Sequence, residues 1–340
     1  MQDGLFASHD WSVLTHYART APLVMHLHIS KTGGTTLRMQ GAGALRRRDC
    51  GWNLRDGQLS IATANAKQVN CSYISIEAPV LRLPWSFGGA EWPTRGFTVT
   101  MVRNPVEQWL SVVRHTYREF DSIAAGRSGQ VASERQHLAS AARAILSFQN
   151  DTSLIGSYQG HDPRNMQTRW LGPSLPSALS RLSDSRMLVL VNEFYDASIC
   201  LMAVVADNWP AFRSHCRCGG SHVSKNLNEK TSADHIKGVG IQQRSPIDGL
   251  EHSDIGMLTN FLADDFILYG RAMRIFLDDV RAAEAHVKQR FLCNRNAIAD
   301  EMYERWNKRP KAFDEPPERP WMTHGMPAPS MKGQRNETKS

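Results

Sequence analysis

The segment SKTGGTT, from Ser30 to Thr36, combines one lysine with two glycines and three threonines. It directly follows the apolar run of residues 23–29, which predicts a strand, a tight loop and the start of a helix. Glycines let a backbone turn closely around a ligand, Thr35 and Thr36 can cap the helix, and free amides at a helix N-terminus favour an anion. Lys31 adds a positive charge, so the segment is typical of a phosphate or sulfate site.

The order of residues in this loop distinguishes it from the Walker A motif of kinases and ATPases. In that motif the lysine follows the second glycine and precedes Ser or Thr, whereas Lys31 precedes both Gly33 and Gly34. The sequence therefore disfavours a kinase or an ATPase. For this segment alone, the alternative is a simple helix cap and turn beside a solvated lysine.

A second polar cluster follows another apolar, β-branched run. Residues 97–102 end at Arg103-Asn-Pro, and the predicted helix that begins at residue 106 carries Ser111 two turns later. A guanidinium presents a planar fork of donors that suits phosphate oxygens, and a hydroxyl adds one more donor. Arg103 and Ser111 can therefore bind one phosphate together. Taken alone, an arginine at a strand end is more often a partner in a surface ion pair.

In combination, the two segments resemble the sulfotransferases that use 3′-phosphoadenosine 5′-phosphosulfate, particularly the membrane-bound carbohydrate type typified by heparan sulfate 6-O- and 2-O-sulfotransferases. The stretch from His28 to Thr36 is similar to their loop for the 5′-phosphosulfate. The stretch from Arg103 to Ser111 is similar to their Arg-Asp-Pro-Val-x-x-x-x-Ser element for the 3′-phosphate, with Asn104 as the departure. Over residues 22–276 the resemblance implies nucleotide contacts from Lys31, Thr32, Gly33, Gly34, Thr35, Thr36, Arg103 and Ser111.

The resemblance implies a P-loop-like sulfotransferase fold and transfer of a sulfuryl group from that nucleotide cosubstrate to a hydroxyl, with no metal. Lys31, as a catalytic residue, would stabilise charge on the departing adenosine 3′,5′-bisphosphate. We expect a carbohydrate acceptor, and a tyrosyl or small-molecule acceptor is the alternative. The loop around Ser224 and Lys225 is similar to one that closes over the nucleotide, so both residues are further candidates for phosphate contacts; a flexible surface loop is the alternative.

The residue that would take the acceptor proton departs from the family pattern. The heparan enzymes carry a histidine in an Ile-x-Gly-His-x-Pro stretch, and Ile74-Ser-Ile-Glu-Ala-Pro places Glu77 at that position. Because a buried carboxylate can act as a base, Glu77 is the candidate base. The alternatives are an ion-paired Glu77 at a strand end, with His26, His28 or His115 as the base.

The net charge of +7 favours anionic partners of several classes. A basic nucleic-acid-binding module is the alternative from another functional class. The basic residues are dispersed and no RNA or DNA motif is recognisable, so we expect no nucleic acid partner. The run Arg46-Arg-Arg48 either attracts an acidic glycan or forms a solvated face.

The cysteines offer a competing interpretation as a zinc site. His215, Cys216, Cys218 and His222 lie close together in sequence, but they lack the Cys-x-x-Cys spacing that usually opens a structural zinc site. A disulfide from this segment to one of two distant cysteines, or simple free thiols, is the simpler interpretation. The two distant candidates are Cys200 and Cys293.

The order of predicted strands and helices that must position these residues indicates an α/β domain, with a central parallel sheet flanked by helices. Short apolar runs at residues 23–29, 73–76, 97–102 and 187–191 predict strands covered on both faces. Helical patterns occupy residues 35–40, 106–120, 133–148, 165–171, 195–207, 253–276 and 280–306. We expect residues 1–20 to be an N-terminal extension, residues 21–308 the sulfotransferase domain and residues 309–340 a Pro-rich, disordered tail.

Hydropathy bears on the compartment. No run approaches the roughly 18 uninterrupted apolar residues that a membrane helix requires. The resemblance implies the Golgi lumen, where such enzymes sit behind one N-terminal anchor. We therefore expect membrane attachment only through an anchor absent from this chain, and otherwise a soluble intracellular protein.

Overall fold

The computed structural model describes residues 8–30, 32–54, 71–77, 86–87, 90–91, 96–109, 111–112, 164–218 and 252–292. The chain divides into two compact units, Met1–Cys293 and Asn294–Ser340, and all described residues belong to the first. The predicted helix at residues 133–148 and the predicted tail lie outside the described residues. Within the described ranges, no helix is both long and apolar enough to cross a membrane.

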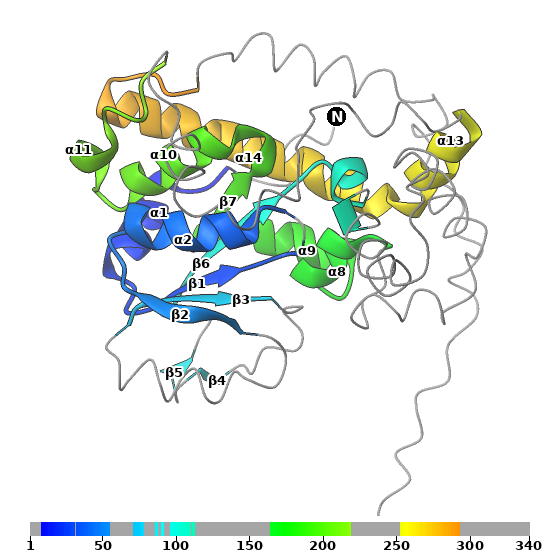
Figure 1. The fold of residues 1–340 in the computed structure, drawn as a ribbon, viewed down its shortest axis with the longest axis horizontal. Helices are drawn as coiled ribbons and strands as arrows, with labels where there is room; N and C mark the ends of the chain where they lie inside the picture. Colours follow the sequence, from blue (N-terminus) through cyan, green and yellow to red (C-terminus); the bar gives the residue numbers. More distant parts are fainter. Residues whose placement is uncertain are drawn as a thin grey trace, which may run out of the picture. The chain divides into compact units, whose positions relative to one another are not determined.

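Five parallel strands form the central sheet, in the order β2-β3-β1-β6-β7 (Figure 1). Their bounds are β1 Val24–Leu27, β2 Asp49–Leu54, β3 Tyr73–Ile76, β6 Phe97–Val102 and β7 Met187–Val191. Every residue of β1, β3 and β7 is buried, as expected for strands covered on both faces. The predicted α/β class and parallel sheet are confirmed. A separate antiparallel pair joins β4, Ser86–Phe87, to β5, Ala90–Glu91.

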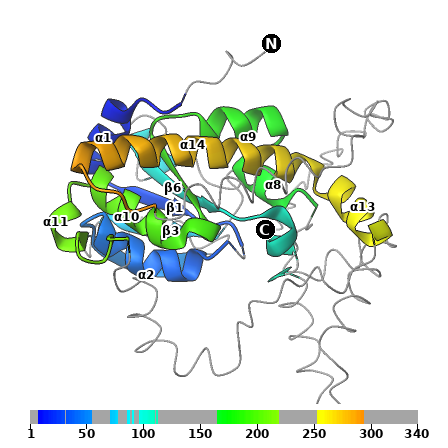
Figure 2. The ribbon, with the colours of Figure 1, turned by 90° about the horizontal axis from the view of Figure 1, so that it is seen from above.

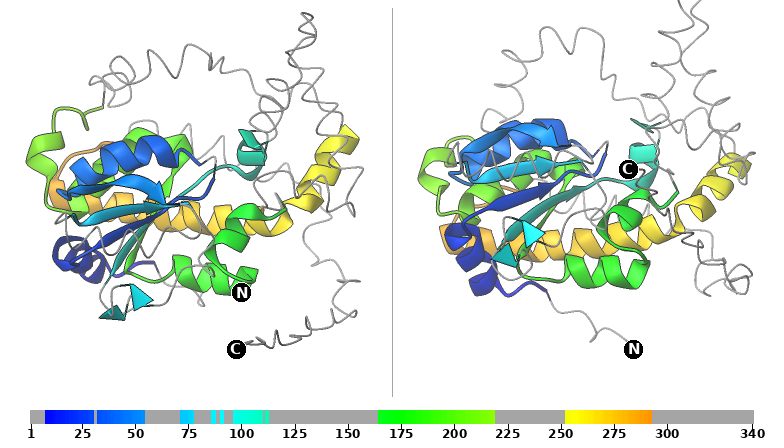
Figure 3. Two further views of the ribbon diagram at one scale, coloured as in Figure 1. Left: turned by 60° about the horizontal axis from the view of Figure 1, so that its bottom comes forward. Right: turned by 90° about the horizontal axis from the view of Figure 1, so that it is seen from below.

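Helices flank the sheet (Figures 2 and 3). On one face lie α2, Gly34–Ala44, and α10, Tyr195–Val205; on the other lie α1, Trp11–Thr20, and α9, Leu175–Leu182. The long helix α14, Ala263–Val287, packs against β7, α8, α9 and α10. Shorter elements are α8 Met166–Leu171, the 3-10 turn η2 Asn192–Phe194, α11 Trp209–Phe212 and α13 His252–Phe261.

The boundary between the last two helices differs from the prediction. We expected a break between residues 276 and 280, but α14 continues through this stretch and the break lies at Leu262. The cause is a long-range cap, because Asn165 Oδ1 accepts hydrogen bonds from the amides of Asp264 at 3.1 Å and Asp265 at 3.3 Å. A side chain about a hundred residues away therefore starts the helix, and local sequence does not reveal it.

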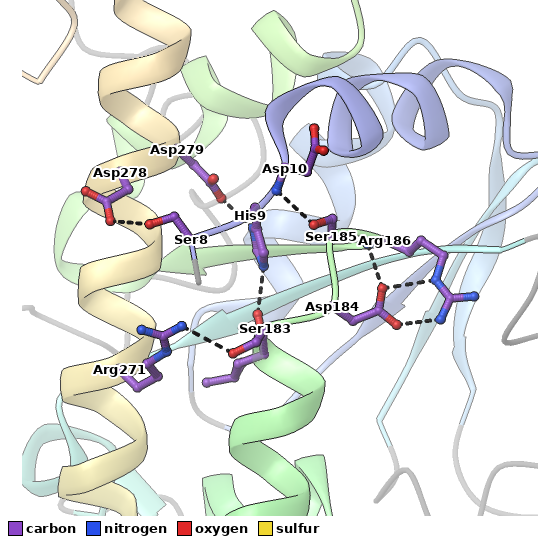
Figure 4. A network of polar contacts seen from close by, with 11 residues as sticks. Ser8, His9, Asp10, Ser183, Asp184, Ser185, Arg186, Arg271, Asp278 and Asp279 are labelled. Carbon is purple, nitrogen blue, oxygen red and sulfur yellow. Dashed lines mark hydrogen bonds and ion pairs between the residues drawn. The ribbon is translucent and has the colours of Figure 1, made fainter. Parts of the chain in front are cut away.

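A polar network attaches the first described residues to α9 and α14 (Figure 4). His9 Nδ1 lies 2.8 Å from Asp279 Oδ2, and His9 Nε2 donates to the Leu182 carbonyl at 2.7 Å. Burial lowers the pKa of His9, but the hydrogen bonds to Asp279 and Leu182 and the charges of Asp279 and Asp184 together outweigh this effect, and the net pKa is raised. Asp10 then caps α1 by accepting from the Ser12 amide at 2.9 Å. The helix at residues 11–20 thus belongs to the packed first unit, where it contacts α10.

Candidate anion-binding site

The first candidate loop connects β1 to α2. Thr32 is fully buried, and its hydroxyl donates to the Ile29 carbonyl at 2.8 Å, so this side chain shapes the turn. Gly33 is the N-cap of α2, with a φ of +89° and no side-chain cap. Only glycine adopts that conformation without strain. Lys31 lies outside the described residues.

The start of α2 corrects one prediction. Thr35 and Thr36 were expected to cap the helix, but α2 already begins at Gly34, so both lie inside its first turn. The cap is the left-handed conformation of Gly33 instead. Amides in the first turn of a helix have no partner within the helix, so the backbone of residues 34–36 can donate to an anion.

The His28 imidazole supports this turn from below. It is 4% exposed, and a Cβ added to Gly34 would come closer than 3.0 Å to its ring. Gly34 is therefore needed for close packing. His26, 1% exposed, stacks on His28 with ring centroids 5.5 Å apart and lies 3.0 Å from the Ser75 hydroxyl. Burial holds the pKa of His26 well below its usual value, which fits a neutral core histidine.

The second candidate motif begins where β6 ends. Asn104 Oδ1 accepts from the amides of Val106 at 3.0 Å and Glu107 at 3.3 Å, and Pro105 occupies the first helical position. Asn and Asp cap helices about equally well. The departure from the family's Arg-Asp-Pro therefore preserves the cap. Ser111 is also helical and is half-buried.

A buried glutamine holds the backbone of Arg103. Gln167 Oε1 accepts from the Arg103 amide at 3.0 Å, and Gln167 Nε2 donates to the Arg103 carbonyl at 2.8 Å. The Arg103 guanidinium is a quarter exposed and lies 3.7 Å from the Glu107 carboxylate. The side chain thus stays at the surface while its backbone is fixed on both sides.

Asp265 fixes Gln167 in turn. Its carboxylate accepts from the amides of Gln167 at 3.1 Å and Thr168 at 2.7 Å, which caps α8. Burial raises the pKa of Asp265 to about 6, against the opposing effect of these hydrogen bonds. Because Asn165 caps α14 while Asp265 caps α8, the two helices fix each other beside Arg103.

The two motifs meet directly. Gln108, in the helix after Arg103, is 2% exposed and donates from Nε2 to the Ser30 carbonyl at 2.9 Å. The strands that precede the two motifs, β1 and β6, are parallel neighbours, so both motifs lie at the carboxyl ends of the strands. The structure therefore joins the start of the first loop, at Ser30, to the helix that follows Arg103 through the side chain of Gln108.

The candidate base, Glu77, also lies at the carboxyl ends of the strands. Glu77 directly follows β3, and β3 pairs with β1 so that the Ile76 carbonyl accepts from the His28 amide at 2.8 Å. Glu77 is half-buried. Ser224, Lys225 and His115 lie outside the described residues, so their predicted roles stay predictions.

The cysteines in the described ranges are engaged in disulfides. Cys200 is bonded to Cys216 and Cys50 to Cys71, and Cys218 is disulfide-bonded as well. The disulfide to Cys200 confirms the simpler interpretation of the His215–Cys218 segment, and the zinc interpretation is wrong because these sulfurs are oxidised. No cluster of three or more metal-binding side chains occurs in the described ranges.

The arginine run after α2 has structural partners. Arg46 Nε donates to Asn208 Oδ1 at 2.7 Å, and Arg47 donates to the Ala18 carbonyl at 2.9 Å and the Arg19 carbonyl at 3.0 Å. These bonds satisfy the C-terminal end of α1 and orient Asn208. Two of the three guanidinium groups thus serve packing contacts.

No family model matches this sequence, and no curated protein does either. A function for the site therefore has to follow from the residues and contacts described above. Their arrangement offers the amides of a helix after β1, an arginine after β6 and a carboxylate after β3.

Proposed function

We propose that the chain is a sulfotransferase that moves a sulfuryl group from 3′-phosphoadenosine 5′-phosphosulfate to a hydroxyl, on a P-loop-like fold. The observation that carries the proposal is the contact between two anion-binding motifs, in which Gln108 donates to the Ser30 carbonyl at 2.9 Å. Open parallel sheets bind ligands at the carboxyl ends of their strands, where both motifs lie. A nucleotide with an anionic group at each end of its ribose matches two such motifs.

In the proposed reaction, the acceptor hydroxyl loses its proton and its oxygen bonds to sulfur. The bond between sulfur and the 5′-phosphate oxygen breaks, and adenosine 3′,5′-bisphosphate leaves with that electron pair. Lys31 and the amides of residues 34–36 stabilise the charge that develops on the leaving phosphate. Arg103 and Ser111 hold the 3′-phosphate, and Glu77 accepts the proton. In this proposal the loop with Ser224 and Lys225 closes over the nucleotide.

We propose a carbohydrate hydroxyl as the acceptor and the Golgi lumen as the compartment. The disulfides Cys50–Cys71 and Cys200–Cys216 support the compartment, because disulfides persist in oxidising environments and are rare in the cytosol.

Thermal unfolding with adenosine 3′,5′-bisphosphate tests the proposal. At a hundredfold excess over its dissociation constant, the ligand should add about 2.7 kcal/mol to the free energy of unfolding. Arg103→Ala should abolish the shift. Arg186→Ala is a matched control, because Arg186 pairs with Asp184 at 2.6 Å before β7 begins, at the opposite end of the strands.

Two outcomes would contradict the assignment: a wild-type chain that the nucleotide does not stabilise, or equal loss of the shift in both arginine variants. A turnover assay tests the role of Lys31 separately. Lys31→Ala should lower the rate of sulfuryl transfer by on the order of a hundredfold, the typical cost of losing one charge-stabilising donor.

A further inference from the structure

The turn after β7 contacts both candidate motifs through adjacent residues. Asn192 and Glu193 open η2 directly after the strand. Asn192 Oδ1 lies against Gly33 of the first loop, where an added Cβ would come closer than 3.0 Å to it. Glu193 Oε1 accepts from the Asn104 amide of the second motif at 2.7 Å. One dipeptide directly after a third strand therefore contacts the point where each motif becomes a helix.

A second hydrogen bond fixes the carboxylate of Glu193. The Tyr269 hydroxyl, on α14, donates to Glu193 Oε2 at 3.1 Å, and Tyr269 is 3% exposed. Desolvation of its carboxylate raises the pKa of Glu193, while the Asn104 amide, the Tyr269 hydroxyl and the charge of Arg103 oppose that rise. Each carboxylate oxygen thus has a donor, which suits a group that fixes backbone rather than one that exchanges protons with a substrate.

The spacing of two half-sites decides how well they bind one ligand. When both ends of a ligand can be engaged together, the second contact is intramolecular and affinity rises by roughly 10²–10⁴ over one contact alone. This gain is lost when the geometry forbids simultaneous engagement. Any residue that sets the distance between the two motifs therefore controls the preference for a two-ended ligand over a one-ended one.

We propose that the Asn192–Glu193 turn is a positioning element that sets the spacing of the two anion-binding motifs, with Glu193 as its positioning residue. This inference rests on the proposed function, because that function supplies the two-ended ligand. Asn192 restrains the first loop by contact at Gly33. Glu193 restrains the second through the amide of Asn104, immediately beside Arg103.

The test compares two ligands by isothermal titration calorimetry on the full chain. Adenosine 3′,5′-bisphosphate engages both motifs, and adenosine 5′-monophosphate engages the first loop only. In Glu193→Ala, we expect the preference for the bisphosphate to fall by about tenfold or more, with the affinity for the monophosphate unchanged. Glu193→Gln keeps a carbonyl oxygen that can accept from the Asn104 amide, so it should restore most of the preference.

Asp279→Asn is the matched control, since it removes the charge of a different acid, which is buried in α14 about 15 Å along the helix from Tyr269. It should leave the preference unchanged. If Glu193→Ala does not fold, Tyr269→Phe loosens the same carboxylate and should lower the preference severalfold. An unchanged preference in Glu193→Ala, or in Tyr269→Phe when that variant is used, overturns the inference. A wild-type chain with no preference for the bisphosphate overturns the proposed function, and the inference with it.

Discussion

The packing of His28 beneath Gly34 makes the effect of a glycine substitution depend on a second residue. A Cβ at Gly34 would come closer than 3.0 Å to the His28 ring, and Gly34 is the first residue of α2. Forcing a methyl group into a packed site costs about 1–3 kcal/mol. Where the space is free, Gly→Ala in a compatible conformation stabilises by about 0.4–1 kcal/mol. Gly34→Ala should therefore destabilise the wild type and stabilise the His28→Ala variant.

The predicted coupling free energy between Gly34→Ala and His28→Ala is the difference between the destabilising effect with His28 present and the stabilising effect without it, about 1.4–4 kcal/mol. Denaturant unfolding of the wild type, both single variants and the double variant under oxidising conditions measures it. Gly43→Ala is the control on the same helix, because nothing lies within 4 Å of a Cβ added there. That substitution should be stabilising with or without His28. Additivity of Gly34→Ala and His28→Ala within about 0.5 kcal/mol would refute the packing argument.

Three further predictions concern ionisation and the disulfides. Burial raises the pKa of Asp265 from 3.8 to about 6, so the folded state binds the carboxyl proton more tightly than the unfolded state does. The stability that the protonated carboxyl contributes is therefore lost as the pH rises through about 6. Asp265→Asn should remove that component, and unfolding of both chains at about pH 4 and about pH 7 measures it. The raised pKa of His9 contributes to the free energy of unfolding. This contribution is fully present below pH 6.5 and is lost as the pH rises through the raised pKa. Protease cleavage of the wild type near α1 should accordingly increase with pH. Cleavage of the His9→Ala variant should not depend on pH. A wild type whose cleavage does not depend on pH would contradict the role of His9. Reduction of Cys200–Cys216, which closes a 16-residue separation, should cost about 3 kcal/mol, and an unchanged melting temperature in Cys200→Ala would contradict this.

The sheet was predictable where strands are covered on both faces. The apolar runs at 73–76, 97–102 and 187–191 coincide with β3, β6 and β7, because such strands need no polar face and read as continuous apolar segments. The edge strand β2 was not predicted. Its sequence DCGWNL carries Asp, Gly and Asn, and it pairs only with β3. Pairing with a neighbour, rather than local preference, makes it a strand.

The loops of the candidate site were predictable from the sequence, and the side chains that support these loops were not. Glycine pairs and the Arg-Asn-Pro turn are local patterns, and the structure places them at one sheet edge. The contacts of Gln108, Gln167 and Glu193 were not predicted, because each residue contacts backbone 64 to 89 residues away in sequence. A single Gln or Glu carries no periodic signal that marks such a contact.

The most direct test of the central claim is a crystal structure of the chain with adenosine 3′,5′-bisphosphate. The account predicts one nucleotide spanning the two motifs, with its 5′-phosphate on the amides of residues 34–36 and its 3′-phosphate on Arg103 and Ser111. A nucleotide bound elsewhere, or bound with neither phosphate on these groups, would contradict the account.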